Sequence, residues 1–325
     1  MKTKRAILVK PGKFEMQEFD ISPKPDEVLV KIASCGLCNW ELNHWVGALG
    51  PYPQSMGHEW AGTVVDMGKE AKGFKEGDNI TMFPPPDPIS CVLKEGFSEY
   101  ATISASCCVK ISKNLDPKYA FAEPLKCIVT VLRACEPNIG DNAVIIGCGP
   151  MGLWCIQGLA GNSLNSLIAV DIDDTKLGLA KKYGATHTIN PKNEDAFELI
   201  KDITQEHMAD FVIEGTGIPA MMNTGLTYVR ETGRGKLIMM SSHKDVTKEF
   251  SFKMAMEKSA EIKVAHPLYS LSQYDDLRRA VLLINKDVFN IKDLVSHEFA
   301  LEDINEAFET LENKSLDYLK GIVIP

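Results

Sequence analysis

The chain has 325 residues and a formal net charge of −9, and 45% of its residues are hydrophobic. This length favours two domains over one, and the composition is that of an ordinary globular protein with large apolar cores. The acidic balance and the lack of a basic stripe argue against nucleic acid as a partner. No run of about 18 apolar residues predicts a transmembrane helix, so we expect no membrane association.

The nine cysteines and the first residues bear on the cellular compartment. An odd number of cysteines without a framework spacing favours reduced thiols and a cytoplasmic protein, with one or two thiols bound to a metal. Residues 1–9 carry basic side chains, but their apolar run is too short for a signal peptide and predicts a first strand instead.

The first hundred residues are predicted to be rich in β-strands. Alternating apolar and polar residues over 27–32 and the apolar run 62–65 predict strands, separated by turns that contain Gly or Pro. The proline-rich segment 83–88 is incompatible with a central strand and predicts a loop. Many short strands with such turns indicate a small barrel or a partly closed sheet.

From about residue 125 the pattern changes to alternating strands and helices. The expected strands are 143–146, 167–170, 211–213 and 236–240, and the expected helices between them are 175–183 and 194–206. This order predicts a parallel, doubly wound sheet in an α/β protein. Helices near 273–284 and 301–311 and a strand near 321–324 are expected to return to the first domain.

A glycine-rich segment follows the first strand of this region. Gly147, Gly149 and Gly152 have the spacing G-x-G-x-x-G, which permits a tight turn, close approach of phosphates and close packing of the next helix. The motif alone is weak, but the strand 167–170 ends in Asp171, where a dinucleotide fold places an acid on the adenosine ribose. The segment predicts dinucleotide binding, with a βαβ unit that binds no cofactor as the alternative.

Several polar side chains lie at positions suited to a metal site. Cys38 follows a predicted strand, His58 and Glu59 precede one, and Glu123 lies where the two patterns meet. A thiolate, an imidazole and a carboxylate suit zinc, and three protein ligands plus water are the pattern of a catalytic site. Cys35 and Cys38 could instead form a redox pair or half of a structural zinc site. From spacing alone, a buried apolar cysteine and a hydrogen-bonded histidine are the simpler alternative.

The chain resembles the zinc-dependent alcohol and polyol dehydrogenases of the medium-chain dehydrogenase/reductase superfamily, nearly from end to end. The resemblance is carried by segments 35–38 (CGLC), 57–62 (GHE-x-x-G), 74–78 (FKEGD), 96–100 (GFSEY), 123–125 (EPL) and 147–152 (GCGPMG). It implies a GroES-like, β-rich catalytic domain formed by residues 1–124 and 268–325. Residues 125–267 would form a Rossmann NAD-binding domain.

The resemblance also implies roles for the polar side chains. The second cysteine and the histidine of Gly-His-Glu bind the catalytic zinc in that family, which implies these roles for Cys38 and His58. Glu59 matches an acid that can enter the coordination sphere, and Glu123 matches the third protein position. Glutamate there resembles the sorbitol, xylitol, threonine and butanediol dehydrogenase branch. Glu59 and Glu123 are also candidate catalytic groups, because Trp40 replaces the Ser or Thr whose hydroxyl passes the substrate proton outward.

Other positions near Cys38 depart from the family pattern. Glu41 replaces the usual Asp that orients the zinc histidine. Trp40, His44 and Trp45 are expected to line the substrate side, with core packing as the alternative for the two tryptophans. The segment 83–96 replaces a four-cysteine lobe that holds a structural zinc and contains a single cysteine, so we expect one zinc per chain.

The expected cofactor is NAD. A carboxylate at Asp171 accepts hydrogen bonds from the ribose of NAD and repels the extra phosphate of NADP, and Lys176 is a further ribose contact by family position. The remaining cofactor-binding residues implied by the resemblance are Gly147, Gly149, Pro150, Met151, Gly152, Gly215 and Thr216.

The implied reaction interconverts a secondary alcohol of a polyol, sugar, cyclitol or amino alcohol and its ketone by hydride transfer. Zinc would polarise the substrate oxygen, as it lowers the pKa of bound water to about 7. A homo-oligomer, either a dimer or a tetramer, is expected, with an edge near 251–267 as its interface. The alternatives are a zinc-independent, NADPH-dependent reductase of the same superfamily and a non-catalytic nucleotide-binding protein.

Overall fold

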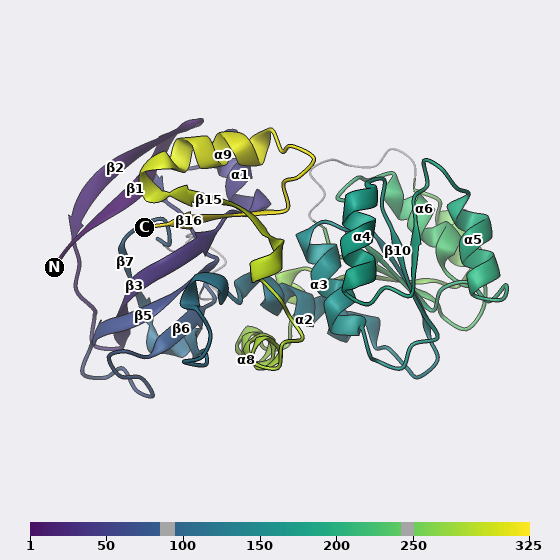
Figure 1. Ribbon diagram of the computed structural model, residues 1–325, viewed down its shortest axis with the longest axis horizontal. Coiled ribbons are helices and arrows are strands. Elements are labelled where there is room, and N and C mark those ends of the chain that lie inside the picture. The colour runs from purple at the N-terminus through teal and green to yellow at the C-terminus, as the bar shows by residue number, and fades with distance from the viewer. Residues whose placement is uncertain (85–94, 242–249) are drawn as a thin grey trace. The chain divides into compact units, whose positions relative to one another are not determined.

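The computed structural model describes residues 1–84, 95–241 and 250–325, so most of the expected loop 83–88 lies outside the described residues. The chain divides into two compact units. Unit 1 comprises Met1–Lys126 and Leu277–Pro325, and unit 2 comprises Cys127–Asp276. Figure 1 colours the chain from purple to yellow, and both of its ends belong to unit 1. Within the described ranges, no helix combines the length and the apolar composition that crossing a bilayer requires.

Unit 1 is rich in β-strands, as predicted. Its described residues form a three-stranded sheet in the order β2-β1-β4 and a seven-stranded sheet in the order β15-β16-β3-β5-β6-β8, with β7 paired to β3. The strands are β1 (Lys2–Lys10), β2 (Lys13–Asp20), β3 (Glu27–Gly36), β4 (Gln54–Ser55), β5 (Trp60–Met67), β6 (Asn79–Met82), β7 (Tyr100–Ser104), β8 (Cys108–Lys110), β15 (Val295–Ala300) and β16 (Lys320–Ile324). The C-terminal strand β16 pairs antiparallel with β3, with Ile322 opposite Gly36.

Helices α1 (Asn39–Trp45) and α9 (Ile304–Glu312) complete the core of unit 1. Trp45 stacks on Phe14 at a centroid distance of 5.7 Å, and Phe308 lies 5.4 Å from the Trp45 ring. The Trp45 Nε1 atom donates a hydrogen bond of 2.9 Å to Glu312. Trp45 is therefore a core residue, so the core-packing alternative holds for this tryptophan.

Unit 2 contains a six-stranded sheet among its described residues, in the order β11-β10-β9-β12-β13-β14. The strands are β9 (Asn142–Ile146), β10 (Ser166–Val170), β11 (His187–Ile189), β12 (Phe211–Glu214), β13 (Lys236–Met239) and β14 (Glu261–Val264). All neighbouring pairs are parallel. This is the doubly wound order of the Rossmann fold, in which ligands bind where the order reverses, here between β9 and β12. The predicted fold class is confirmed.

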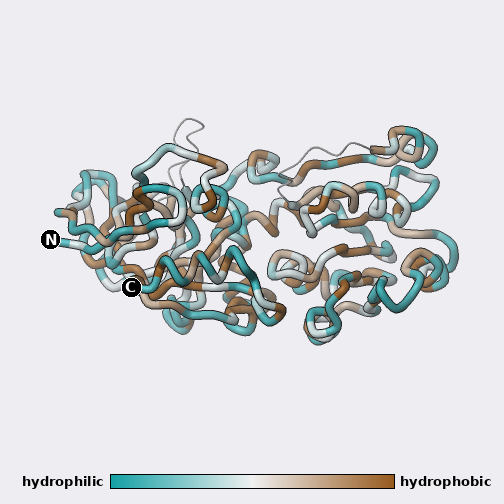
Figure 2. Tube along the Cα trace, turned by 90° about the horizontal axis from the view of Figure 1, so that it is seen from above, coloured by the Kyte–Doolittle hydropathy of each residue, from teal (hydrophilic) through white to brown (hydrophobic). Residues whose placement is uncertain are grey.

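Helices cover both faces of this sheet, with α3 and α4 on one side and α5 and α6 on the other (Figure 1). The helices of unit 2 are α3 (Pro150–Leu159), α4 (Asp174–Lys182), α5 (Ala196–Ile203), α6 (Met221–Tyr228) and α7 (Phe252–Glu257). Every residue of β9 and β10 is buried, as expected of parallel strands covered on both faces. In Figure 2 the interior of this unit is accordingly largely brown and its outer turns largely teal.

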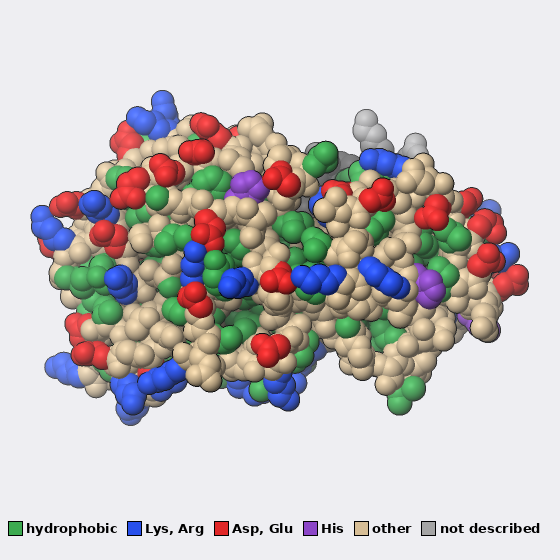
Figure 3. All heavy atoms as spheres, in the orientation of Figure 1, with side chains coloured by type: hydrophobic (Ala, Val, Ile, Leu, Met, Phe, Trp, Pro, Cys, Tyr) green, Lys and Arg blue, Asp and Glu red, His purple; other side chains and the backbone are tan. Residues whose placement is uncertain are grey.

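Two helices include residues of both units, α2 (Glu123–Cys135) and α8 (Gln273–Ile284). Short 3₁₀ turns span Ala105–Cys107, Pro117–Tyr119, Pro267–Tyr269, Lys292–Leu294 and Leu301–Asp303. Acidic and basic side chains are interspersed over the face drawn in Figure 3, which agrees with the lack of a basic stripe in the sequence.

Candidate metal centre and cofactor site

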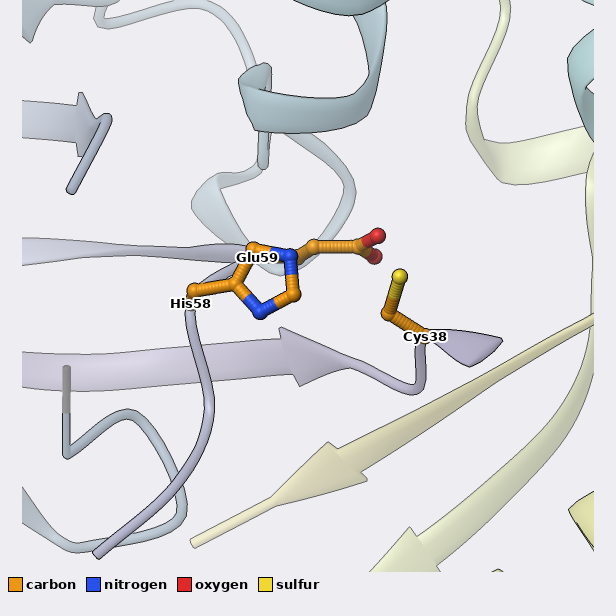
Figure 4. A group of neighbouring side chains, drawn as sticks. All are labelled: Cys38, His58 and Glu59. Atoms are coloured by element: carbon orange, nitrogen blue, oxygen red, sulfur yellow. The ribbon is translucent and has the colours of Figure 1, made fainter. Parts of the chain in front are cut away.

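Three side chains of unit 1 that are expected to bind zinc converge in the structure. The Sγ atom of Cys38, a ring nitrogen of His58 and a carboxylate oxygen of Glu59 all lie within 4.8 Å of one another (Figure 4). His58 is 8% exposed and Glu59 is 2% exposed, so both are largely removed from water. A half-buried thiol and a buried imidazole and carboxylate that converge in this way form the donor set of a catalytic zinc site. The residues present therefore fit a zinc ion.

The position of Cys38 follows from the way β3 continues into α1. Cys38 has extended backbone angles and is the N-cap of α1, where its Sγ accepts a hydrogen bond of 3.4 Å from the Trp40 backbone N–H. Glu41 completes a capping box by accepting a hydrogen bond of 3.2 Å from the Cys38 N–H. These bonds satisfy N–H groups at the start of the helix and fix the direction of the thiol.

Glu41 also holds the imidazole of His58. Its Oε1 atom accepts hydrogen bonds from the backbone N–H groups of Gly57 (2.9 Å) and His58 (3.0 Å) and lies 2.9 Å from His58 Nδ1. Glu41, which is one methylene longer than the Asp usual in the family, thus makes the contact with His58 that is expected of that Asp. With Nδ1 engaged, Nε2 is the ring nitrogen left for a metal, which is the arrangement found around metal-bound histidines.

A buried lysine contacts Glu59. Lys320 is the first residue of β16 and is only 7% exposed. Its Nζ atom donates to Glu59 Oε2 and to the backbone oxygen of Leu37, the latter at 2.9 Å. Burial lowers the pKa of Lys320, but Glu59, Cys38 and Tyr318 together raise it by more, so the pKa lies above its ordinary value and the ammonium is retained. This residue was not recognised from the sequence; a lysine directly before the apolar run 321–324 was the available signal.

Glu123 lies beside the three converging side chains. It begins α2, and its Oε2 atom is 3.9 Å from His58 Nε2, while its Oε1 atom is 2.7 Å from the Nζ atom of Lys126. Burial raises the pKa of the Glu123 carboxyl, but Lys126 and His58 lower it by more, so the pKa lies below its ordinary value. Glu123 is therefore an ionised carboxylate at neutral pH. Lys126 was also missed from the sequence.

The pKa values of the two other ligand candidates are raised. Burial raises the pKa of the Cys38 thiol, and Glu59 raises it further. Burial lowers the pKa of His58, but Glu41 and Cys38 raise it by more, so it lies well above its ordinary value. A metal ion at this position would displace protons from both groups, because it binds the thiolate and the neutral imidazole.

The two residues expected on the substrate side, Trp40 and His44, lie on α1. Trp40 is half-buried, and its ring centroid is 6.1 Å from that of His44. His44 Nδ1 lies 2.8 Å from the side-chain nitrogen of Gln54, so this ring nitrogen is the acceptor. The other ring nitrogen, Nε2, is then a buried donor with no hydrogen-bond partner among the described residues.

The glycine motif of unit 2 forms the expected turn between β9 and α3. Gly147 has a φ of 94°, and a Cβ atom on Gly152 would lie 1.9 Å from the Gly147 oxygen, so the helix can approach the strand only with glycine there. A Cβ atom added to Gly149 would meet no neighbouring atom within 4 Å, so the space beside this residue is open. Pro150 and Met151 start α3. The turn has the shape that accommodates a phosphate at a helix N-terminus.

The other expected cofactor contacts surround this turn. Asp171 follows β10, and its Oδ2 atom accepts a hydrogen bond of 2.6 Å from the Cys148 N–H. Asp173, not Asp171, is the N-cap of α4, and the Nζ atom of Lys176 lies 3.6 Å from Asp173. Gly215 and Thr216 follow β12; their backbone atoms lie 3.2 Å from the Cβ position of Gly147. Unit 2 thus brings together all the cofactor-binding residues expected from sequence.

Comparisons with known proteins agree with both units. Residues 24–113 match the family model described as alcohol dehydrogenase GroES-like domain, and residues 150–284 match the one described as zinc-binding dehydrogenase. The L-threonine 3-dehydrogenase of Pyrococcus furiosus is 29% identical over an alignment of 325 positions, which covers 91% of this chain and 91% of that protein. The sorbitol dehydrogenase of Bacillus subtilis is 26% identical over an alignment of 327 positions, which covers 92% of this chain and 90% of that protein.

The structural comparison supports the same assignment of the fold. The crystal structure of 2R,3R-butanediol dehydrogenase from Bacillus subtilis superposes with a TM-score of 0.86 and 23% sequence identity, covering 99% of each chain. At this identity the likeness establishes the fold, and the two family matches establish the lineage. The chain belongs to the zinc-type medium-chain dehydrogenase/reductase superfamily and is sorbitol-dehydrogenase-like.

Proposed function

We propose that this chain is a zinc-dependent, NAD-linked dehydrogenase that interconverts a secondary alcohol and its ketone by hydride transfer. The observation that carries the proposal is the largely buried donor set of Cys38, His58 and Glu59, whose ligand atoms lie within 4.8 Å of one another. Their residue types are those of a catalytic zinc site with a position left for substrate. Bound there, zinc supplies Lewis-acid polarisation of an alcohol oxygen, and the nicotinamide supplies the hydride acceptor.

The protein's own groups have separate tasks in this proposal. Glu41 keeps the proton on His58 Nδ1 and so presents Nε2 to the metal. Glu59 belongs to the ligand set, and Lys320 fixes its carboxylate. The Oε2 atom of Glu123 is the proposed acceptor of the hydroxyl proton, because Glu123 is ionised and Trp40 has no hydroxyl that could relay it.

The substrate side is assigned to α1. His44 has a buried Nε2–H donor that would gain a partner from a hydroxyl oxygen of a bound polyol. Trp40, half-buried beside it, would cover the carbon skeleton. The substrate classes that fit are polyols, sugars, cyclitols and amino alcohols, and relatives named for sorbitol and for threonine support that range.

NAD is the proposed cofactor, held by the glycine turn, Gly215 and Thr216. Asp171 supports NAD over NADP, because its carboxylate stands directly after β10 and beside the glycine turn, where an adenosine ribose binds. Lys176, next to it on α4, is proposed as a second ribose contact.

A homo-oligomer is proposed through the edge of the sheet in unit 2. Strand β14 is an edge strand of that sheet, and its Ile262 and Val264 side chains are 39% and 56% exposed. Phe252 and Met256 on α7, the helix that precedes β14, are 78% and 74% exposed. An edge strand with exposed apolar side chains is a template for pairing with another chain.

The direct test is turnover of secondary-alcohol polyols and of threonine with NAD and with NADP, followed by the absorbance of the reduced nicotinamide. We expect NAD-dependent oxidation of at least one polyol, which H58A abolishes while the protein stays folded by circular dichroism. A wild-type chain that loads zinc but oxidises no member of the panel with either cofactor would contradict the proposed function. A preference for NADP would contradict the role of Asp171 alone.

A further inference from the structure

Lys126 is a buried cation beside the candidate metal centre. It lies one helical turn after Glu123 on α2 and is only 2% exposed. Lysine is almost never this deeply buried unless it is paired, because removing an ammonium group from water is costly. Its Nζ atom lies 2.7 Å from Glu123 Oε1, so the pair consists of two buried charges in hydrogen-bond contact. The position calls for a role that an apolar side chain could not fill.

The geometry of Glu123 shows what this contact does. Its Oε2 atom is 3.9 Å from His58 Nε2, the nitrogen left for the metal, yet Glu123 is not part of the group whose ligand atoms lie within 4.8 Å of one another. A carboxylate is a good zinc ligand, and a cation so near would attract Glu123 into its coordination sphere. The hydrogen bond from Lys126 instead holds the other carboxylate oxygen of Glu123, Oε1, toward the next turn of α2.

We propose that Lys126 is a positioning residue that holds Glu123 outside the zinc ligand set, so that a position remains open for the substrate oxygen. The inference rests on the proposed function in one respect, that zinc binds at Cys38, His58 and Glu59. Glu59 has its own lysine, Lys320, but stays within the ligand group. The two lysines therefore act differently: Lys320 accompanies a ligand, and Lys126 restrains a carboxylate that would otherwise become one.

The test measures zinc affinity directly, by competition with a chromophoric chelator. In K126M the freed Glu123 carboxylate joins the ligands, so we expect zinc to bind about tenfold tighter or more, the size of effect typical of residues around a metal site. Cobalt(II)-substituted K126M should show a visible spectrum of higher coordination number than the wild type, and kcat should fall. K126R, which keeps the charge and the hydrogen bond, should resemble the wild type. K13M, at an exposed lysine of β2, is the matched control.

A double mutant separates positioning from structure. Because Lys126 acts through Glu123, the effect of K126M on zinc affinity should disappear in an E123Q background. If K126M lowers only the melting temperature and leaves zinc affinity and the cobalt spectrum unchanged, the inference is wrong. A shift that persists with E123Q also overturns it. K126L, which also removes the hydrogen-bond donor near Glu123, carries the same expectation if K126M does not fold. A wild-type chain that binds no zinc would instead refute the proposed function.

Discussion

At the scale of single residues, Glu41 connects the metal centre to the backbone around it. One carboxylate receives the N–H groups of Cys38, Gly57 and His58 and the ring nitrogen Nδ1 of His58. Its side chain is fully buried. It therefore ties the start of α1 to the segment before β5, and these two segments carry all three proposed zinc ligands. The replacement of the usual Asp by a longer acid does not break this link.

Loss of the Glu41 charge should weaken metal binding. In E41Q the amide is a poorer partner for His58 Nδ1, so we expect zinc affinity to fall about 10- to 100-fold. Chelator competition measures this, with thermal unfolding recorded beside it to separate affinity from stability. E302Q, at an exposed glutamate of unit 1, should leave zinc affinity unchanged. Equal affinities for E41Q and the wild type would mean that Glu41 has no part in metal binding.

The sequence could indicate the ligand candidates but not the charges that surround them. Cys38, His58 and Glu59 belong to short motifs, and such motifs can be read without knowledge of the fold. Lys320 is 261 positions away from Glu59 in the chain, and the pairing of β16 with β3 creates their contact. Lys126 is close to Glu123, but a lysine on a helix usually faces solvent, and only tertiary packing buries it.

At the scale of elements, strands and long helices followed from periodicity, whereas two helices next to the site did not. Helix α1 has Cys38 as its N-cap, which is not one of the residues that signal a helix start. Helix α2 begins at Glu123 with Pro124 in its first turn, and that proline was the available signal. The strand order of unit 2 was predictable because successive βαβ units are constrained in their connections.

The β6–β8 pair offers a test of pH dependence remote from the metal centre. Asp78 precedes β6 and is 5% exposed; its Oδ2 atom accepts from the Lys75 N–H at 3.0 Å and pairs with Lys110 of β8 at 2.7 Å. Burial raises the pKa of Asp78, but Lys110 and the Lys75 N–H lower it by more, so it lies below its ordinary value. A lowered pKa in the folded state stabilises the protein above the unfolded-state pKa, and this contribution is lost as the pH falls.

We therefore expect D78N to reduce the free energy of unfolding by about 1 to 2 kcal/mol at pH 7. The difference from the wild type should shrink as the pH falls below about 4, because the Asp78 carboxyl then takes up a proton in the unfolded chain while the folded chain still holds the carboxylate. Chemical denaturation at a series of pH values measures both effects. D26N, at an exposed aspartate, should differ little from the wild type throughout. A D78N deficit that stays constant down to the acid limit would contradict the role of the ion pair.

At the scale of the whole molecule, the chain combines a β-rich unit that carries the proposed metal donors with a Rossmann unit that carries the proposed dinucleotide-binding residues. The change in sequence pattern near 125 indicated two domains, but it could not define their exact limits. Helices α2 and α8 each contain residues of both units, so no loop marks either boundary. The proposed assembly rests on exposed apolar side chains of β14, whose exposure is a property of the folded sheet.

The proposed oligomer predicts a specific effect of charge at that edge. In V264D a carboxylate replaces an exposed apolar side chain of β14, so the paired edge would bury like charges from two chains. We expect the mass in solution, measured by light scattering after gel filtration, to fall from a dimer or tetramer to a smaller species. I139D alters another exposed apolar residue of unit 2 and should leave the mass unchanged. A monomeric wild-type chain would refute the proposed interface.

Everything proposed about catalysis depends on zinc bound by Cys38, His58 and Glu59. The most direct test is elemental analysis of zinc per chain in the purified wild type and in C38S, both prepared with zinc supplied. We expect about one zinc per wild-type chain and almost none in C38S, because loss of the thiolate removes one of three protein ligands. A wild-type chain without zinc, or a C38S chain that keeps its zinc, would show that these three residues do not form the metal site.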